Sequence, residues 1–166
     1  MSDAYLLDTN IASALWDKCH ENHTGFRERL GRLGEAPVYV SVVSLAEVEY
    51  GLRIAPRIDG ERQRRVRANM SQFKVLALDR HVVEYYAELR ARLFSKYSPR
   101  NSRGRLTAKV VPDLWERSPD KLLGIQENDL WIASAAVERN LVLVTSDRLT
   151  HIQAVAGDDL RVERWE

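Results

Sequence analysis

The sequence predicts an α/β fold, in which a mostly parallel sheet of about five strands lies between two layers of helices. Short apolar runs of strand length alternate with longer segments whose apolar residues recur at helical spacing. This alternation is typical of a parallel sheet that is covered on both faces. The chain has 166 residues, 45% of them hydrophobic and 30% charged, which indicates one globular domain over residues 1–166.

Five apolar runs are predicted as strands. They cover residues 4–7, 37–40, 75–78, 141–144 and 161–165, and the last is expected at a sheet edge. Between them, helices are predicted from their apolar stripes and capping residues. They start at Thr9 or Asn10, Thr24, Ser41 or Ser44, Asp59 or Gly60, Asp79, and Asn128. Gly34 and Pro56 mark the ends of the second and third helices.

The segment from about residue 96 to residue 126 interrupts this alternation. It contains Pro99, Gly104, Pro112 and Pro119 in a basic context. We interpret it as an inserted basic loop, with one helical turn near residues 114–115. Loops of this length inside a small domain are usually functional.

Four acidic residues stand beside apolar runs. Asp8 follows the first strand, Glu47 interrupts an apolar helix, Asp129 precedes residues 130–133, and Asp147 ends the run that begins at Leu141. A carboxylate at the end of a buried strand costs several kcal/mol unless a positive group meets it. The carboxyl ends of parallel strands share one sheet edge, so these four side chains are expected to lie close together.

Each acidic residue also has an ordinary explanation. Asp8 and Asp129 are suited to capping helices, Asp147 to a turn, and Glu47 to a solvated helix face. Their joint occurrence at one edge favours a bound cation instead. Oxygen ligands select Mg²⁺, with Mn²⁺ as the alternative, and such ions activate water for attack on a phosphodiester.

Four segments in this order resemble the motifs of PIN-domain ribonucleases. They are residues 6–10 (LLDTN), 44–51 (SLAEVEYG), 128–133 (NDLWIA) and 143–147 (LVTSD). The single-domain size and the second motif are most similar to VapC-type toxins of toxin–antitoxin pairs. The resemblance implies a PIN-like three-layer α/β/α sandwich, Mg²⁺- or Mn²⁺-dependent endoribonuclease activity, a homodimer, and a cognate antitoxin that blocks the site. In compact relatives, the connection that corresponds to residues 95–127 is shorter.

The site residues follow from the acidic positions. We predict Asp8, Asp129 and Asp147 as metal ligands, direct or through water, and Glu47 as a ligand or as the group that orients the attacking water. Four neighbouring polar side chains are expected to hold these carboxylates or bound waters in place, namely Thr9, Asn10, Thr145 and Ser146. The number of metal ions stays open.

Two basic stretches are candidates for RNA binding. On the fourth predicted helix, Arg62 and Arg65 share a face and suit a phosphate track. The alternatives there are a solvated face paired with Asp59 and Glu61, or a surface for an acidic antitoxin tail. In the inserted loop, the charges of Arg100, Arg103 and Arg105 lack local acidic partners, which favours contact with RNA or a partner.

Several other classes are disfavoured. There is no Gly-x-Ser-x-Gly, Gly-x-Gly-x-x-Gly or Walker A sequence, and Cys19, His20 and His23 make a poor zinc site. A receiver domain would need a lysine that is absent from the expected strand. A housekeeping PIN nuclease and a non-catalytic RNA- or partner-binding PIN module remain alternatives. One cysteine, no secretion signal and no apolar stretch of roughly 20 residues predict a cytoplasmic protein without membrane association.

Overall fold

A computed structural model describes residues 3–55, 59–98, 100–105 and 125–166. Its five strands form one parallel sheet in the order β3-β2-β1-β4-β5. The strands are β1 (Tyr5–Leu7), β2 (Val38–Ser41), β3 (Lys74–Leu76), β4 (Val142–Thr145) and β5 (Arg161–Arg164). The prediction of a mostly parallel five-stranded sheet is therefore confirmed, and β5 is an edge strand as expected.

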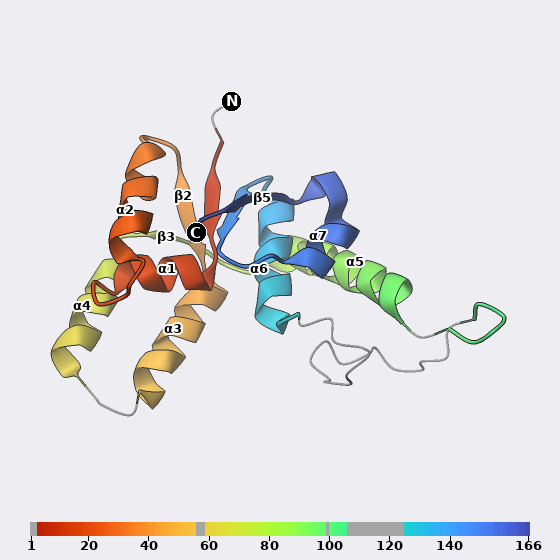
Figure 1. The fold of residues 1–166 in the computed structure, drawn as a ribbon, viewed down its shortest axis with the longest axis horizontal. Coiled ribbons are helices and arrows are strands. Elements are labelled where there is room, and N and C mark those ends of the chain that lie inside the picture. Colours follow the sequence, from red (N-terminus) through yellow and green to blue (C-terminus); the bar gives the residue numbers. More distant parts are fainter. Residues whose placement is uncertain (1–2, 56–58, 99, 106–124) are drawn as a thin grey trace.

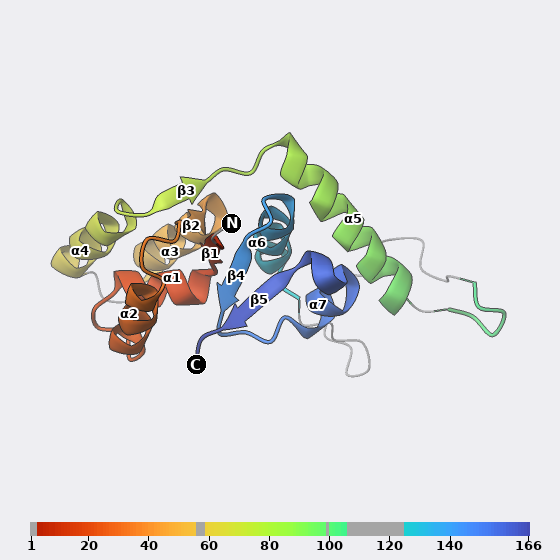
Figure 2. The same ribbon diagram turned by 90° about the horizontal axis from the view of Figure 1, so that it is seen from above.

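Seven α-helices and one short 3-10 helix lie in the described part of the chain. They are α1 (Thr9–Trp16), α2 (His23–Arg32), α3 (Val42–Ile54), α4 (Gly60–Met70), α5 (Arg80–Tyr97), α6 (Glu127–Glu138), α7 (Thr150–Ala156) and η1 (Gly157–Asp159). Figures 1 and 2 show α1 to α4 on one side of the central strands and α5 to α7 on the other. The predicted three-layer sandwich is thus also confirmed.

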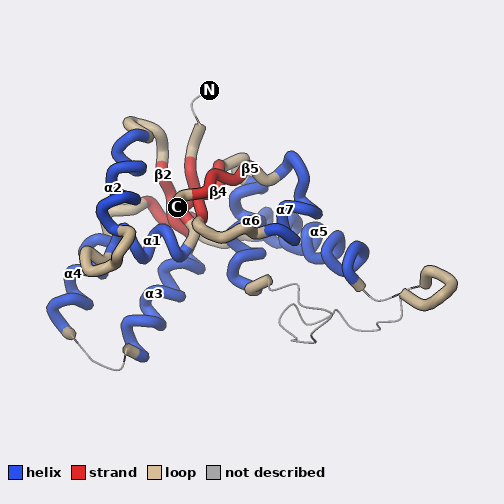
Figure 3. The backbone as a smooth tube through the Cα atoms, in the orientation of Figure 1, coloured by secondary structure: helices blue, strands red, loops and turns tan. Residues whose placement is uncertain are grey.

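The alternation of side chains along β1 divides the core into two clusters. Leu6 packs on one face of the sheet with residues of α5, α6 and α7, including Leu89 and Ile132. Leu7 packs on the other face with residues of α1 and α2, including Ile11 and Phe26. Because consecutive strand residues point to opposite faces, a three-residue strand can serve both layers. Figure 3 shows the strands enclosed between the two groups of helices.

The helix starts were predicted to within one or two residues, with one correction of interest. We expected Thr9 or Asn10 to cap α1, whereas the cap is Asp8, whose side chain accepts a hydrogen bond from the Thr9 backbone. Ser41, Asp59 and Asp79 cap α3, α4 and α5 as predicted. The predicted strand at residues 75–78 is shorter, because only Lys74–Leu76 pair with β2.

Two elements were not predicted. Helix α7 and η1 follow β4, and α7 starts after Leu149, which adopts a left-handed conformation with φ 44°. A left-handed conformation is uncommon for leucine, so the sequence does not predict this turn. Part of the inserted loop is described: Arg100 donates hydrogen bonds to the carbonyls of Gly104 and Ser95, which closes a tight turn. Residues 106–124, with the predicted turn near 114–115, lie outside the described residues, as does Pro56.

In the described residues, no helix is both long and apolar enough to cross a membrane.

Candidate active site

The four acidic residues converge on one edge of the sheet. Asp8 directly follows β1, and Asp147 lies two residues beyond the end of β4. Glu47 lies in α3, which starts immediately after β2, and Asp129 is in the first turn of α6. Since β1 is paired in parallel with both β2 and β4, their carboxyl ends meet at this edge.

Asp8 is the buried member of this cluster, with 3% of its surface exposed. The Thr145 hydroxyl donates a 2.7 Å hydrogen bond to Asp8 Oδ2, and the Thr9 amide donates one of 2.7 Å to Oδ1. Burial raises the pKa of Asp8, and the charges of Asp147 and Glu47 raise it further, while the two hydrogen bonds act in the opposite direction.

Asp147 is tied to Asp8 through the same hydroxyl group. Its backbone amide donates a 3.0 Å hydrogen bond to Thr145 Oγ1, which itself donates to Asp8. The Asn10 side-chain amide donates a 2.9 Å hydrogen bond to Asp147 Oδ2, and Asn10 Oδ1 accepts from the Ser146 backbone at 3.5 Å. The predicted supporting side chains of Thr9, Asn10 and Thr145 therefore contact the carboxylates, whereas Ser146 contacts Asn10 through its backbone amide.

Both oxygens of Glu47 are held by side chains. The Thr9 hydroxyl donates to Oε2, and Asn128 Nδ2 donates to Oε1 at 2.8 Å. Thr9 Oγ1 also lies 3.0 Å from the Oγ of Ser44, which is fully buried one helical turn before Glu47. The roles of Asn128 and Ser44 were missed from the sequence. The signals were there, because Asn128 adjoins Asp129 and Ser44 has the i,i+3 spacing to Glu47.

Asp129 has the strongest electrostatic perturbation of the four. Burial, together with the negative charges of Asp8, Asp147 and Glu47, raises its pKa to about 7. A hydrogen bond from the Gln126 backbone opposes this shift only in part. Each of the three other carboxylates therefore acts on Asp129 through space, which is the electrostatic signature of a site that favours a cation.

The donor set fits a hard divalent cation with a partly aqueous shell. Among the described residues, no three His, Cys, Asp or Glu side chains are close enough to ligate one ion together. Three simultaneous direct bonds from Asp8, Asp129 and Asp147 therefore do not match this arrangement. Mg²⁺ keeps several waters and needs only one or two direct carboxylates, so ligation partly through water matches both the oxygen chemistry and the positions.

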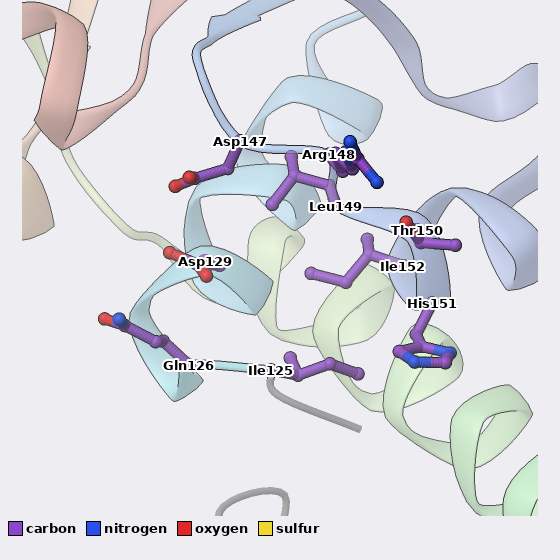
Figure 4. A pocket seen from close by; sticks show the side chains of 9 residues that line it. All are labelled: Ile125, Gln126, Asp129, Asp147, Arg148, Leu149, Thr150, His151 and Ile152. Atoms are coloured by element: carbon purple, nitrogen blue, oxygen red, sulfur yellow. The ribbon is translucent and has the colours of Figure 1, made fainter. Parts of the chain in front are cut away.

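Cavities flank the carboxylates on two sides. One of about 360 Å³ is bordered by Asp129 and Asp147 and extends along the loop between β4 and α7 (Figure 4). Another of about 370 Å³ is bordered by Thr9 and Glu47 and reaches Arg62 on α4. Three of the four carboxylates therefore border a cavity, whereas Asp8 is buried and lines neither of the two.

The predicted RNA-binding arginines are not gathered at the site. Arg62 forms an ion pair with Asp17, and Arg65 forms one with Glu61 on the same helix. The alternative of local pairing therefore describes their present contacts, although the partner of Arg62 is Asp17 rather than Asp59 or Glu61. Residues 100–105, which include Arg100, Arg103 and Arg105, lie beyond the C-terminal end of α5 and away from α4 (Figures 1 and 2).

The turn at residues 19–23 has no metal-site geometry among the described residues. Cys19 is exposed, while the ring nitrogens Nδ1 of His20 and His23 contact the backbone of Asn22 and Ala14. The interpretation as a polar turn between helices agrees with these contacts.

The molecule is thus a parallel α/β sandwich with an acidic cluster at the carboxyl ends of its central strands. The model of the PIN domain family matches residues 5–156, and the chain therefore belongs to that family. A search of curated protein sequences gave no significant match.

Solved structures share the whole fold at low sequence identity. A chain of DNA-bound VapBC from Salmonella typhimurium aligns with a TM-score of 0.68 and 22% identity, over 99% of each chain. VapBC2 from Rickettsia felis, bound to a promoter DNA fragment, aligns with a TM-score of 0.65 and 23% identity, over 98% of this chain and 99% of that one. VapBC-5 from Mycobacterium tuberculosis gives a TM-score of 0.54 and 24% identity, over 97% and 96% of the chains.

Proposed function

We propose that this protein is a metal-dependent endoribonuclease that hydrolyses RNA phosphodiester bonds, and that it is the toxin of a type II toxin–antitoxin pair. The observation that carries the proposal is the position of Asp8, Glu47, Asp129 and Asp147 at one edge of the sheet, where neighbouring side chains hold three of these carboxylates by hydrogen bonds. Four carboxylates held so close are costly without a counter-charge. Membership in the PIN domain family gives this arrangement a nuclease context.

Asp8, Asp129 and Asp147 are proposed to hold the metal, directly or through water. When bound, Mg²⁺ or Mn²⁺ would supply an activated water and neutralise charge on the phosphodiester. Thr145 fixes two of these residues at once, since its hydroxyl donates to Asp8 and accepts from the Asp147 amide. Asn10 fixes the Asp147 carboxylate from the opposite side. The protein's contribution is this rigid placement of negative oxygens.

Glu47 is proposed to orient the attacking water and to accept its proton. Thr9 and Asn128 each donate to one of its oxygens, so the carboxylate has a fixed orientation. Each carboxylate oxygen can accept more than one hydrogen bond, and thus a water molecule still finds an acceptor there. Between the two roles left open by the sequence, the hydrogen bonds support water orientation over direct ligation.

RNA is proposed to cross the site from one flanking cavity to the other. Asp129 and Asp147 border one of these cavities, and Glu47 borders the other. This placement suits a strand that enters, presents one phosphodiester to the carboxylates and leaves. An internal bond would then be cut without a free end in the site, which corresponds to endonuclease action.

The partners are proposed from the structural neighbours. The matching Mycobacterium tuberculosis structure is described as a member of the VapBC family of toxin–antitoxin systems. By this likeness we propose a cognate antitoxin protein for this chain, and from the motif resemblance we propose a homodimer. Expression in a host cell should arrest growth, and the Asp8→Asn variant should not. Growth arrest by both forms equally would contradict the toxin assignment.

The direct test of the activity is incubation of the purified protein with total RNA in Mg²⁺, Mn²⁺ or EDTA, beside the Asp8→Asn variant. Discrete fragments are expected with either metal, absent in EDTA and with the variant. We expect 5′-phosphate and 3′-hydroxyl ends on these fragments. Cleavage that survives EDTA, or that the variant retains, would exclude the proposed mechanism.

A further inference from the structure

The cavity beside Asp129 and Asp147 continues well past the carboxylates. Figure 4 shows the two acids and Gln126 on one side of it, Thr150 and His151 on the opposite side, and apolar side chains between them. A metal with its waters would occupy only the acidic end of about 360 Å³. The rest of the cavity is lined by side chains that have no part in the acidic cluster.

Arg148 is the positive group of this cavity. It directly follows Asp147 and is exposed, and none of the ion pairs found in residues 3–55, 59–98, 100–105 and 125–166 involves it. Arg62, at the other cavity, is by contrast bound to Asp17. A guanidinium without an acidic partner is well suited to contact phosphate oxygens through two parallel donors.

The middle of the cavity is apolar. Ile152 and Ile125 are almost fully buried, with 1% and 4% exposure, and Leu149 is half-buried between Asp147 and α7. Because the two isoleucines are almost wholly covered, Leu149 offers most of the apolar surface against which a flat ring or a ribose can lie. Leu149 is placed there by its left-handed backbone, with φ 44°.

Polar groups that can read the edge of a base stand at the margins. Gln126 is exposed at the start of α6, and its side chain makes no capping hydrogen bond. Thr150 is exposed on the opposite side. An amide and a hydroxyl can both donate to and accept from a base edge. A few polar groups around an apolar floor is the usual composition of a small-ligand site.

We propose that this cavity is the subsite for the nucleotide next to the scissile phosphodiester. Arg148 contacts the phosphate one step along the strand, and the ribose or base lies against Leu149 and Ile152. The assignment rests on the proposed nuclease function, which puts the scissile group at Asp129 and Asp147. Because Asp147 and Arg148 have Cα atoms about 3.8 Å apart, the long arginine side chain can serve the neighbouring phosphate.

The test uses nucleoside monophosphates, which contain no diester bond to cleave. AMP, CMP, GMP and UMP are titrated into the ¹⁵N-labelled protein with Mg²⁺ and with EDTA, and amide shifts are followed. Shifts are expected at Gln126 and at residues 149–152. Arg148→Ala should raise Kd about tenfold, the size expected for loss of a charge-assisted hydrogen bond. Arg148→Lys should restore part of the affinity.

A matched control is Arg27→Ala, because Arg27 is an exposed arginine on α2, across the molecule from α7 (Figure 1). It should leave Kd unchanged. Absence of shifts at residues 149–152, or equal Kd values for wild type and Arg148→Ala, would overturn the subsite.

RNA cleavage separates this inference from the nuclease proposal. With an active enzyme, Arg148→Ala should raise KM about tenfold and change kcat little. If the wild type cleaves RNA and Arg148→Ala has the same KM, the subsite is wrong and the nuclease stands. If residues 149–152 respond to nucleotides but RNA is never cleaved, the nucleotide cavity stands and the nuclease is wrong.

Discussion

The side-chain amide of Asn128 donates a 2.8 Å hydrogen bond to Oε1 of Glu47, joining the N-terminus of α6 to the middle of α3. The hydroxyl of Thr9 holds the other oxygen of the same carboxylate. These bonds link three segments that are far apart in the sequence. They also fix the Glu47 carboxylate in one orientation relative to the other three acidic side chains of the site.

Removing either bond should therefore reduce catalysis more than stability. For Asn128→Ala and for Thr9→Val, we expect kcat for RNA cleavage to fall about 10- to 100-fold, as for other groups that orient catalytic carboxylates. KM should change little in Asn128→Ala, because Asn128 borders neither of the two cavities proposed to hold RNA. Asn22→Ala is a suitable control, since the Asn22 side chain makes no capping bond at the start of α2. Wild-type kcat in Asn128→Ala would show that the orientation of Glu47 is unimportant.

The metal-free protein should lose stability as the pH rises towards neutrality. The pKa of Asp129 is about 7 in the folded protein against an ordinary value of 3.8. Between these values the folded form binds more protons than the unfolded chain, so the free energy of unfolding falls as the pH rises. Urea unfolding in EDTA at pH 4, 6 and 8 measures this trend.

The Asp129→Asn variant isolates the contribution of this residue. The difference from the wild type should be small at pH 4, where Asp129 is protonated in the folded form and only partly ionised in the unfolded chain, and the variant should be the more stable form at pH 8. Asp158→Asn, an exposed carboxylate in η1, should not change the trend. Identical pH profiles for wild type and Asp129→Asn would refute the repulsion described at the sheet edge.

RNA contact by the inserted loop can be tested with substitutions that leave the turn of the loop intact. Arg100 holds the turn through backbone carbonyls, so Arg103→Ala with Arg105→Ala is the cleaner change. If both contact phosphates, KM should rise and the salt slope of RNA binding should fall by about 1.4, at roughly 0.7 per contact. The pair Arg62→Ala and Arg65→Ala tests α4 in the same way. An unchanged slope in both double variants would remove these residues from the RNA surface.

Trp165 should be important for stability rather than for chemistry. It is 1% exposed, packs on Phe26 with ring centroids 5.9 Å apart, and donates its indole hydrogen bond to Glu163. Trp165→Ala should cost about 3–5 kcal/mol of unfolding free energy, as for other large buried side chains. Trp165→Phe should recover much of this in urea unfolding. A loss below about 1 kcal/mol for the alanine variant would mean that the site collapses around the gap.

Much of the fold could be predicted because its signals are local. Apolar runs and capping residues such as Ser41, Asp59 and Asp79 indicate strands and helix starts without knowledge of the rest of the chain. Helix α7 was missed because its start depends on Leu149 in a left-handed conformation. No glycine, asparagine or aspartate at that position indicates such a conformation in the sequence.

The candidate site shows the same division. The positions of Asp8 and Asp147 follow from the rule that the carboxyl ends of parallel strands meet at one edge. Thr145 is two residues before Asp147 in the sequence, which brings it to the same edge. The sequence shows the spacing of Asn128 and Ser44 from the acidic residues but not their partners. The bond from Asn128 to Glu47 depends on how α6 lies beside α3, and the contact of Ser44 with Thr9 depends on how α1 lies beside α3. The partners of Arg62 and Arg65 likewise depend on tertiary placement, as the pair between Arg62 and Asp17 illustrates.

The central claim is that the four carboxylates form one site for a divalent cation, and Mn²⁺ titration followed by calorimetry tests it most directly. Near pH 7 the wild type should bind Mn²⁺ and release protons, since the pKa of Asp129 is about 7 and the bound form must be ionised. The heat should then vary with the ionisation enthalpy of the buffer, and binding should be strongly reduced in Asp8→Asn and Asp129→Asn. The account would be contradicted if the wild type did not bind Mn²⁺, or if both variants bound it as tightly as the wild type.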